Sequence, residues 1–117
     1  RELKSMDPSL MYPAVRGGDV DAIVAFSTDG RIPAFSLVVL PDNLHVIPPY
    51  DAIVLGRPGL SRDRPAVVEA LRPLMGQIDE AGMQRMNGAV DLGHETPAEV
   101  AAGFLAEAGL GPVDASR

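Results

Sequence analysis

Three short apolar runs in the first half of the chain constrain its fold more than any other feature. They are Val20 to Phe26, Leu37 to Leu40 and Asp51 to Leu55. Valine and isoleucine recur in them, and runs of this length and composition favour buried strands over helices. The first two are followed by turns, one polar and one beginning with proline. The sequence therefore predicts three strands, buried against other parts of the fold.

Four helices are predicted around these strands. Asp7 can cap the first, with Pro8 at the favoured first helical position, and a glycine pair ends it. Pro73 should end or kink the second, and residues 96–99 (TPAE) form a capping box for the last. The helices are residues 8–16, 65–75, 79–90 and 97–108. One helix, three strands and three helices predict an α/β fold class.

Composition excludes several kinds of function. A chain of 117 residues suffices for one small domain. Its net charge is −6 and its basic residues are scattered, whereas nucleic-acid binding needs clustered Lys and Arg. There is no cysteine, and His45 and His94 lack a second ligand at helical spacing. We therefore expect no metal site, no cofactor and no nucleic-acid partner.

The start of the chain indicates a piece of a longer protein. It opens Arg1-Glu2-Leu3-Lys4, without an initiator methionine and without the apolar segment of a signal peptide. No apolar run reaches the roughly 20 residues that cross a bilayer. We expect a fragment or a processed product, whose location is decided by other parts of its protein.

Two loop segments suggest a ligand site. Residues 26–31 (FSTDGR) place polar residues and a glycine directly after a buried run, and residues 48–51 (PPYD) hold an aromatic ring on a stiff segment. Either could be a simple turn. Together they fit a site, because loops held at strand ends by a rigid scaffold commonly bind ligands. Two of the chain's five aromatic residues, Phe26 and Tyr50, lie in these segments.

Two other functions compete with ligand capture. A small hydrolase could use Ser27 or Asp29, although Ser27 is not in a G-x-S-x-G turn and no base lies at a defined spacing. A regulatory domain could keep the fold without binding anything. A turnover screen separates the first from a binding protein, and titration with betaine separates the second.

Five stretches of the chain resemble one known family. They are residues 19–32 (DVDAIVAFSTDGRI), 37–42 (LVVLPD), 48–52 (PPYDA), 10–15 (LMYPAV) and 96–101 (TPAEVA). They are similar to the substrate-binding proteins of ABC importers for glycine betaine, carnitine and choline. The resemblance runs from about Met6 to Leu110 and matches the C-terminal half of such a protein.

The resemblance implies part of a type II periplasmic-binding-protein fold, in which two α/β lobes close over the ligand. Residues 1–34 would end the second lobe and include the S-T-D-G turn. Residues 35–56 would form the hinge crossing and the return strands. Residues 57–117 would be the C-terminal helical part of the first lobe. Most of the second lobe and the start of the first would lie outside this chain.

The resemblance also implies a function and a site. The protein would be an extracytoplasmic, non-enzymatic component that captures quaternary-ammonium osmoprotectants and delivers them to a membrane permease. The aromatic box of the family falls on Phe26 and Tyr50, with Ser27, Thr28 and Asp29 beside it. A quaternary ammonium donates no hydrogen bonds, so aromatic faces are its best partners. Many relatives have tyrosine where this chain has Phe26.

The predicted strands would leave apolar edges open in an isolated fragment. Exposed edges of this kind pair with whatever strand is available. We therefore expect the 117-residue piece to self-associate, by edge pairing or by exchange of an element, or to pair with the missing half.

Overall fold

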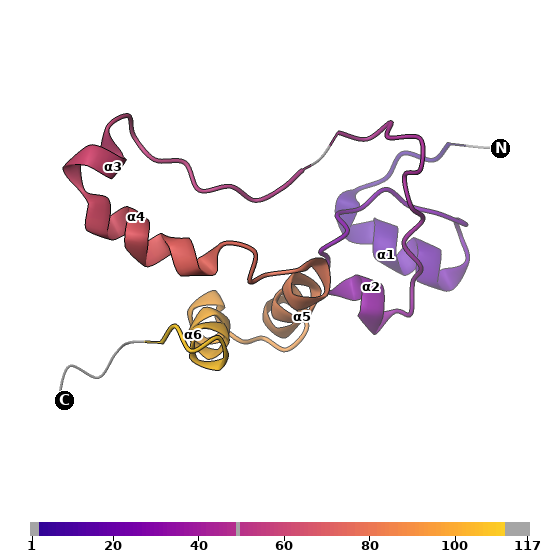
Figure 1. Cartoon of the computed structure of the whole chain (residues 1–117). Helices are drawn as coiled ribbons and strands as arrows, with labels where there is room; N and C mark the ends of the chain where they lie inside the picture. Colours follow the sequence, from indigo (N-terminus) through magenta and orange to yellow (C-terminus); the bar gives the residue numbers. More distant parts are fainter. Residues whose placement is uncertain (1–2, 49, 112–117) are drawn as a thin grey trace.

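The computed structural model describes residues 3–48 and 50–111, and the regular elements within these residues are all helices (Figure 1). The elements in chain order are α1 (Pro8–Gly17), α2 (Arg31–Ala34), α3 (Leu60–Asp63), α4 (Pro65–Leu71), the 3-10 helix η1 (Arg72–Leu74), α5 (Glu80–Asp91) and α6 (Pro97–Glu107). Long irregular segments join α1 to α2 and α2 to α3.

The caps predicted from the sequence are present. The Asp7 carboxylate accepts a hydrogen bond from the Ser9 amide at 2.9 Å at the start of α1. Gly18 ends that helix in the left-handed conformation, with φ of 81°. Thr96 and Glu99 exchange the two hydrogen bonds of a capping box at the start of α6. These local signals were sufficient to locate both helices.

The effect of Pro73 is also confirmed. Helix α4 ends at Leu71, and the chain continues as the 3-10 helix η1, in which Pro73 is the central residue. A proline inside a helix removes one backbone donor and clashes with the preceding turn. Helices α2 and α3 were not predicted, because four residues are too few to show helical periodicity, and α2 also contains Pro33.

The prediction of three strands is wrong for the described residues. None of the three apolar runs has strand structure, and Val24, Val38 and Val54 are 82%, 82% and 77% exposed. A strand is stabilised by hydrogen bonds to a neighbouring strand, and the described chain pairs none with these runs. An apolar run with strand-forming residues thus remains irregular when no strand is paired with it.

The molecule is elongated, with a small core. Its radius of gyration is 18.6 Å, against about 13 Å for a compact domain of this length. It exposes 10016 Å² of surface, against roughly 6000 Å² for a compact protein of its mass. Among the described residues the buried apolar side chains are Tyr12, Ala14 and Ile32.

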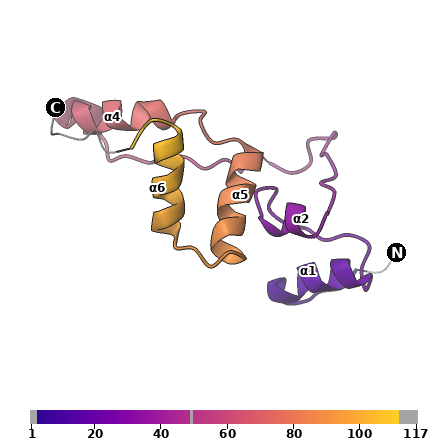
Figure 2. The same cartoon turned by 90° about the horizontal axis from the view of Figure 1, so that it is seen from below.

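The elements that matter for the site surround α5. Helix α2 contacts one side of α5 and α6 contacts it from another, as both views show (Figures 1 and 2). Helix α1 approaches α2 through Tyr12, whose ring packs edge-on against Phe35 at 6.3 Å between centroids. The turn that precedes α2 is therefore placed against α5.

Candidate functional site

The structure brings Phe26 and Tyr50 together, although they are 24 residues apart in sequence. Their ring centroids are 5.5 Å apart and the ring planes are tilted by 35°. Because the centroids are this close, a single cation can lie within about 6 Å of both. Phe26 is 65% exposed and Tyr50 is 86% exposed, so both residues are accessible from outside the described chain. Pro49, part of the predicted stiff segment, lies outside the described residues.

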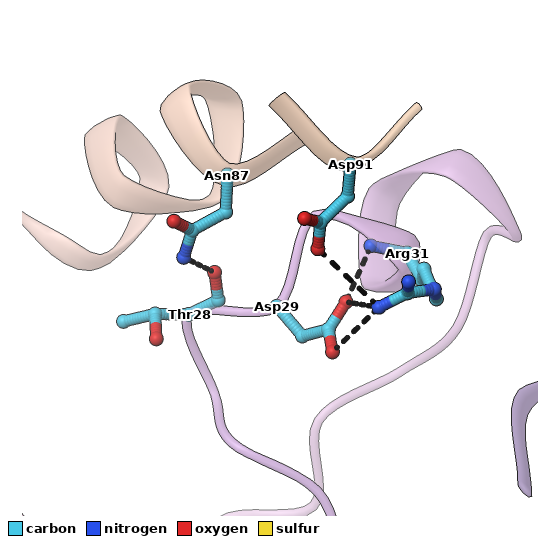
Figure 3. Close-up of polar contacts among 5 residues, drawn as sticks. All are labelled: Thr28, Asp29, Arg31, Asn87 and Asp91. Carbon is cyan, nitrogen blue, oxygen red and sulfur yellow. Dashed lines mark hydrogen bonds and ion pairs between the residues drawn. The ribbon is translucent and has the colours of Figure 1, made fainter. Parts of the chain in front are cut away.

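The backbone of the turn after Phe26 is held by two amide side chains of α5. Gln84 Nε2 donates to the Ser27 carbonyl at 2.6 Å. Asn87 Nδ2 donates to the Thr28 carbonyl at 2.9 Å (Figure 3). The Phe26 carbonyl accepts from the Asp29 amide at 3.1 Å within the turn itself. Three successive carbonyls are thus bound, two of them by residues 57 and 59 positions away.

Gly30 brings this turn into direct contact with the α5 backbone. It is buried, and a Cβ at this position would lie 2.3 Å from the Gly88 nitrogen and 2.4 Å from its Cα. A Cβ does not fit at such distances, and backbone cannot move aside as a flexible side chain can. The close approach of turn and helix therefore requires glycine at position 30.

Arg31 joins the turn to the end of α5 through two carboxylates. Its Nη1 lies 3.4 Å from Asp29 Oδ2 and 3.4 Å from Asp91 Oδ2 (Figure 3). The Asp29 side chain, 18% exposed, also accepts the Arg31 amide at 2.9 Å. The predicted site residue Asp29 is thus engaged by Arg31. Two carboxylates against one guanidinium leave one net negative charge beside the turn, which favours a nearby cation.

Tyr12 closes this cluster from α1. The Arg31 guanidinium carbon lies 5.5 Å from the centre of the Tyr12 ring. The Tyr12 hydroxyl is buried without a hydrogen-bond partner among the described residues. Burial, followed by the nearby Asp29 carboxylate, raises the pKa of Tyr12 to about 12. The phenol is therefore neutral at physiological pH.

The sequence analysis missed the residues of α5 that hold the turn. Gln84, Asn87, Gly88 and Asp91 are spaced i, i+3, i+4 and i+7, so they share one face of the helix. That spacing is visible in the sequence as a polar stripe beside the apolar Met83, Met86 and Val90. This stripe indicates that the face contacts another segment of the protein, but it does not identify that segment.

A separate cavity of about 400 Å³ lies between α5 and α6. Gln77, Arg85 and Glu99 are among its lining residues, and none of the five predicted site residues lines it. No group of three or more possible metal ligands occurs within residues 3–48 and 50–111. The ring pair and the adjacent turn therefore remain the candidate site.

Comparison with protein families gives one match over nearly the whole chain. The model of the substrate binding domain of ABC-type glycine betaine transport system matches residues 1–107. The glycine-betaine-binding protein of Pseudomonas aeruginosa is 34% identical over 91% of this chain and 34% of its own length. The carnitine transport binding protein OpuCC of Listeria monocytogenes is 32% identical over 90% of this chain and 34% of its own length.

Two further similarities extend these findings. The ergothioneine transport permease/ergothioneine binding protein EgtU of Helicobacter pylori is 31% identical over 94% of this chain and 20% of its own length. A crystal structure of a glycine betaine/carnitine/choline ABC transporter matches with a TM-score of 0.85 at 34% identity, over 92% of this chain and 39% of that one.

The comparisons also limit what this chain represents. It spans about a third of the length of the first curated relatives that it matches. Of the helices in the described part, none has the length and apolar character needed to cross a bilayer. The described helices and turns have the arrangement found in one part of a longer binding protein.

Proposed function

This chain belongs to the family of substrate-binding domains of ABC-type glycine betaine transport systems, and we propose that it forms part of an extracytoplasmic protein that captures quaternary-ammonium solutes. Glycine betaine, carnitine and choline are the candidate ligands, and a membrane permease is the partner that receives them. The resemblance found in the sequence is confirmed by the family match and by the relatives. Those relatives carry the names of transport proteins, which supports binding over hydrolysis.

The meeting of Phe26 and Tyr50 is the observation that carries this proposal. A trimethylammonium group spreads its charge over methyl groups and offers no hydrogen-bond donor, so its favourable partners are ring faces. Two rings with centroids 5.5 Å apart provide such faces at one place. The negative charge of the adjacent Asp29–Arg31–Asp91 cluster adds attraction for a cation.

The roles of Ser27, Thr28 and Asp29 as direct ligand contacts remain predictions. The Ser27 and Thr28 carbonyls are used by α5, and the Asp29 carboxylate by Arg31. These residues still border Phe26 in the chain, where their remaining polar groups can reach a ligand. Because both rings are largely exposed, the rest of the pocket must be supplied by polypeptide outside this chain.

Calorimetric titration of the intact binding protein tests the proposal. Tyr50→Ala should weaken choline or glycine betaine binding by roughly 0.5–2 kcal/mol, the range for one cation–π face. Phe26→Tyr should be tolerated or improve binding, because it keeps the ring face and adds a hydroxyl. An equal loss for an uncharged isostere, with carbon in place of the ammonium nitrogen, would show that the rings supply only apolar packing. Failure of the wild type to bind any of the three solutes would reject the proposal.

We also propose that the apolar residues between positions 37 and 55 are covered by the remainder of the binding protein. The chain exposes roughly 4000 Å² more than a compact protein of its mass. The exposed residues include Val38, Leu40, Ile53 and Val54. The relatives contain about twice as much additional polypeptide as this chain provides. Strand pairing with that polypeptide would complete the sheet that the sequence predicts.

The isolated chain offers a test of the same idea. Without the remainder, the apolar segment is expected to pair with a second copy, and light scattering should detect concentration-dependent association. Addition of the complementary polypeptide should replace this self-association with a one-to-one complex. A monomer that unfolds sharply, with no dependence on concentration, would reject both forms of pairing.

A further inference from the structure

We propose that Gln84 and Asn87 of α5 are positioning residues for the ligand site. By holding the Ser27 and Thr28 carbonyls, they fix the peptide groups that follow Phe26 and so the place of its ring opposite Tyr50. This inference rests on the proposed function, because it gives the two amides a role in the capture of a quaternary ammonium. Neither amide would touch the ligand.

The geometry of the two hydrogen bonds supports a positioning role. Gln84 Nε2 and Asn87 Nδ2 donate to adjacent carbonyls at 2.6 and 2.9 Å. Two donors on successive peptide groups fix both the location and the rotation of that stretch of backbone. The first of these carbonyls belongs to the residue directly after Phe26. The Phe26 carbonyl itself accepts from the Asp29 amide of the same turn, so a shift of the clamped turn would move the backbone that carries the ring.

The ring has little other support within the described residues. Phe26 is 65% exposed and Tyr50 is 86% exposed, so few neighbouring atoms restrain either residue. A cation–π contact depends on the cation lying over the ring face within about 6 Å of its centre. The hydrogen bonds from α5 to the backbone that follows Phe26 thus set the orientation of this exposed ring.

The turn is attached to α5 by other contacts as well, which separates positioning from general stability. Gly30 lies against Gly88 with no room for a side chain, and Arg31 pairs with Asp91 at 3.4 Å. These contacts keep the turn on the helix when an amide is removed. Loss of one amide donor should therefore free a peptide group to rotate without detaching the turn.

The test uses three substitutions at position 84 of the intact binding protein, with choline as the probe. Gln84→Met removes the donor at similar volume, Gln84→Glu removes it and adds a negative charge, and Gln84→Lys keeps a donor but adds a positive charge. If the donor matters, choline affinity should fall about tenfold for Met and Glu and about threefold or less for Lys. If only the charge at position 84 matters, the order of choline affinities reverses, because Glu attracts the cation and Lys repels it.

The uncharged alcohol 3,3-dimethyl-1-butanol, in which carbon replaces the ammonium nitrogen of choline, measures what is specific to the cation. Its affinity should change less than threefold in Gln84→Met, because it makes no cation–π contact. Asn87→Leu provides a second, independent removal of a donor with the same expected pattern. Arg85→Met, on an exposed residue of the same helix, is the matched control and should leave choline affinity unchanged.

Each outcome has a distinct meaning. A wild type that binds none of choline, glycine betaine or carnitine overturns the proposed function and this inference with it. A wild type that binds choline, with all position-84 variants binding equally or in the order Glu, Met, Lys, overturns only this inference. Parallel losses of melting temperature and of affinity for both choline and the alcohol would also overturn it, since they indicate structural support alone.

Discussion

The turn that packs on α5 and the segment that follows α2 differ in the contacts that fix their geometry. The clamped turn, residues 27–31, has two carbonyls held by amides, a buried glycine and an arginine between two carboxylates. The open segment, residues 37–58, has no helix or strand among its described residues, and most of its apolar side chains are exposed. The geometry of the turn is set by contacts within this chain. We have proposed that contacts with polypeptide outside this chain set the geometry of the open segment.

Polar and apolar contacts are thus distributed unequally over this chain. Directional hydrogen bonds fix the turn even where the hydrophobic core is small. Apolar burial, which dominates folding free energy, is incomplete within the described residues, and the proposed partner surface would complete it. The following substitutions, in order of expected effect, test whether the two regions differ in this way.

The largest effect is expected from charges in the open segment. In the intact binding protein, the double substitution Val38→Lys and Val54→Lys should lower the free energy of unfolding by about 4–6 kcal/mol. The reason is that both valines would be buried against the remaining polypeptide. Urea denaturation measures the loss. Asn43→Lys in the same segment is the control and should change stability by less than about 0.5 kcal/mol; an equally small effect for the valines would show that the segment stays exposed.

The next effect concerns the contact between the turn and α5. Gly30→Val should cost about 3 kcal/mol, because any Cβ at this position collides with the backbone of Gly88. Gly103→Ala in α6 is the matched control, since no atom lies within 4 Å of its added Cβ. This control should stabilise the protein by about 0.5–1 kcal/mol through helix propensity. Thermal melts of both variants measure these changes in stability. No loss of stability in Gly30→Val would contradict the close contact.

Tyr12 should make stability depend on pH in the alkaline range. Its pKa is raised from 10 to about 12 in the folded protein, so the native state favours the neutral phenol. The resulting stability, at most about 2.7 kcal/mol, is fully present below pH 10 and is lost as pH rises from 10 through 12. Urea denaturation across this range measures the loss.

Tyr12→Phe is the control for this pH dependence. It should remove the alkaline loss that Tyr12 causes. At pH 7 it should be neutral or slightly stabilising, because the buried hydroxyl has no hydrogen-bond partner among the described residues. A loss above about 1 kcal/mol at pH 7 would show that the hydroxyl is hydrogen-bonded.

The smallest effect is expected at the end of α5. Asp91→Asn removes one of the two carboxylates from Arg31, but Asp91 is 42% exposed and Asp29 remains. The cost should be no more than about 1 kcal/mol and should shrink as salt is raised from 0.05 to 1 M. Glu69→Gln, which breaks the exposed pair with Arg72, should cost still less. A loss independent of salt would indicate that Asp91 acts by hydrogen bonding and not by charge.

The sequence predicted those parts of the fold that depend on neighbours close in the chain. Asp7, Pro73 and Thr96 each act on residues within a few positions, so the corresponding helix ends could be located. The three predicted strands are absent from the described residues, because a strand depends on pairing with a second segment and these residues supply none. The apolar pattern marks residues whose burial remains a prediction, and it does not identify the segment that would cover them.

The residues of the candidate site were likewise predicted only in part. Phe26 and Tyr50 were selected from their loops and from the family resemblance, and the structure places their rings together. Gln84 and Asn87 were missed, because their contacts join residues 57 and 59 positions apart. In the sequence, such contacts are visible only as a stripe of polar residues on a helix. A stripe of that kind marks a contacting face without identifying the segment that it contacts.

A crystal structure of the intact binding protein with glycine betaine tests the central claim most directly. We expect the ammonium nitrogen to lie within about 6 Å of the ring centroids of both Phe26 and Tyr50. We also expect the Gln84 and Asn87 amides to hold the turn beside them. A ligand bound away from these rings, or rings that point to opposite sides of the protein, would contradict the account.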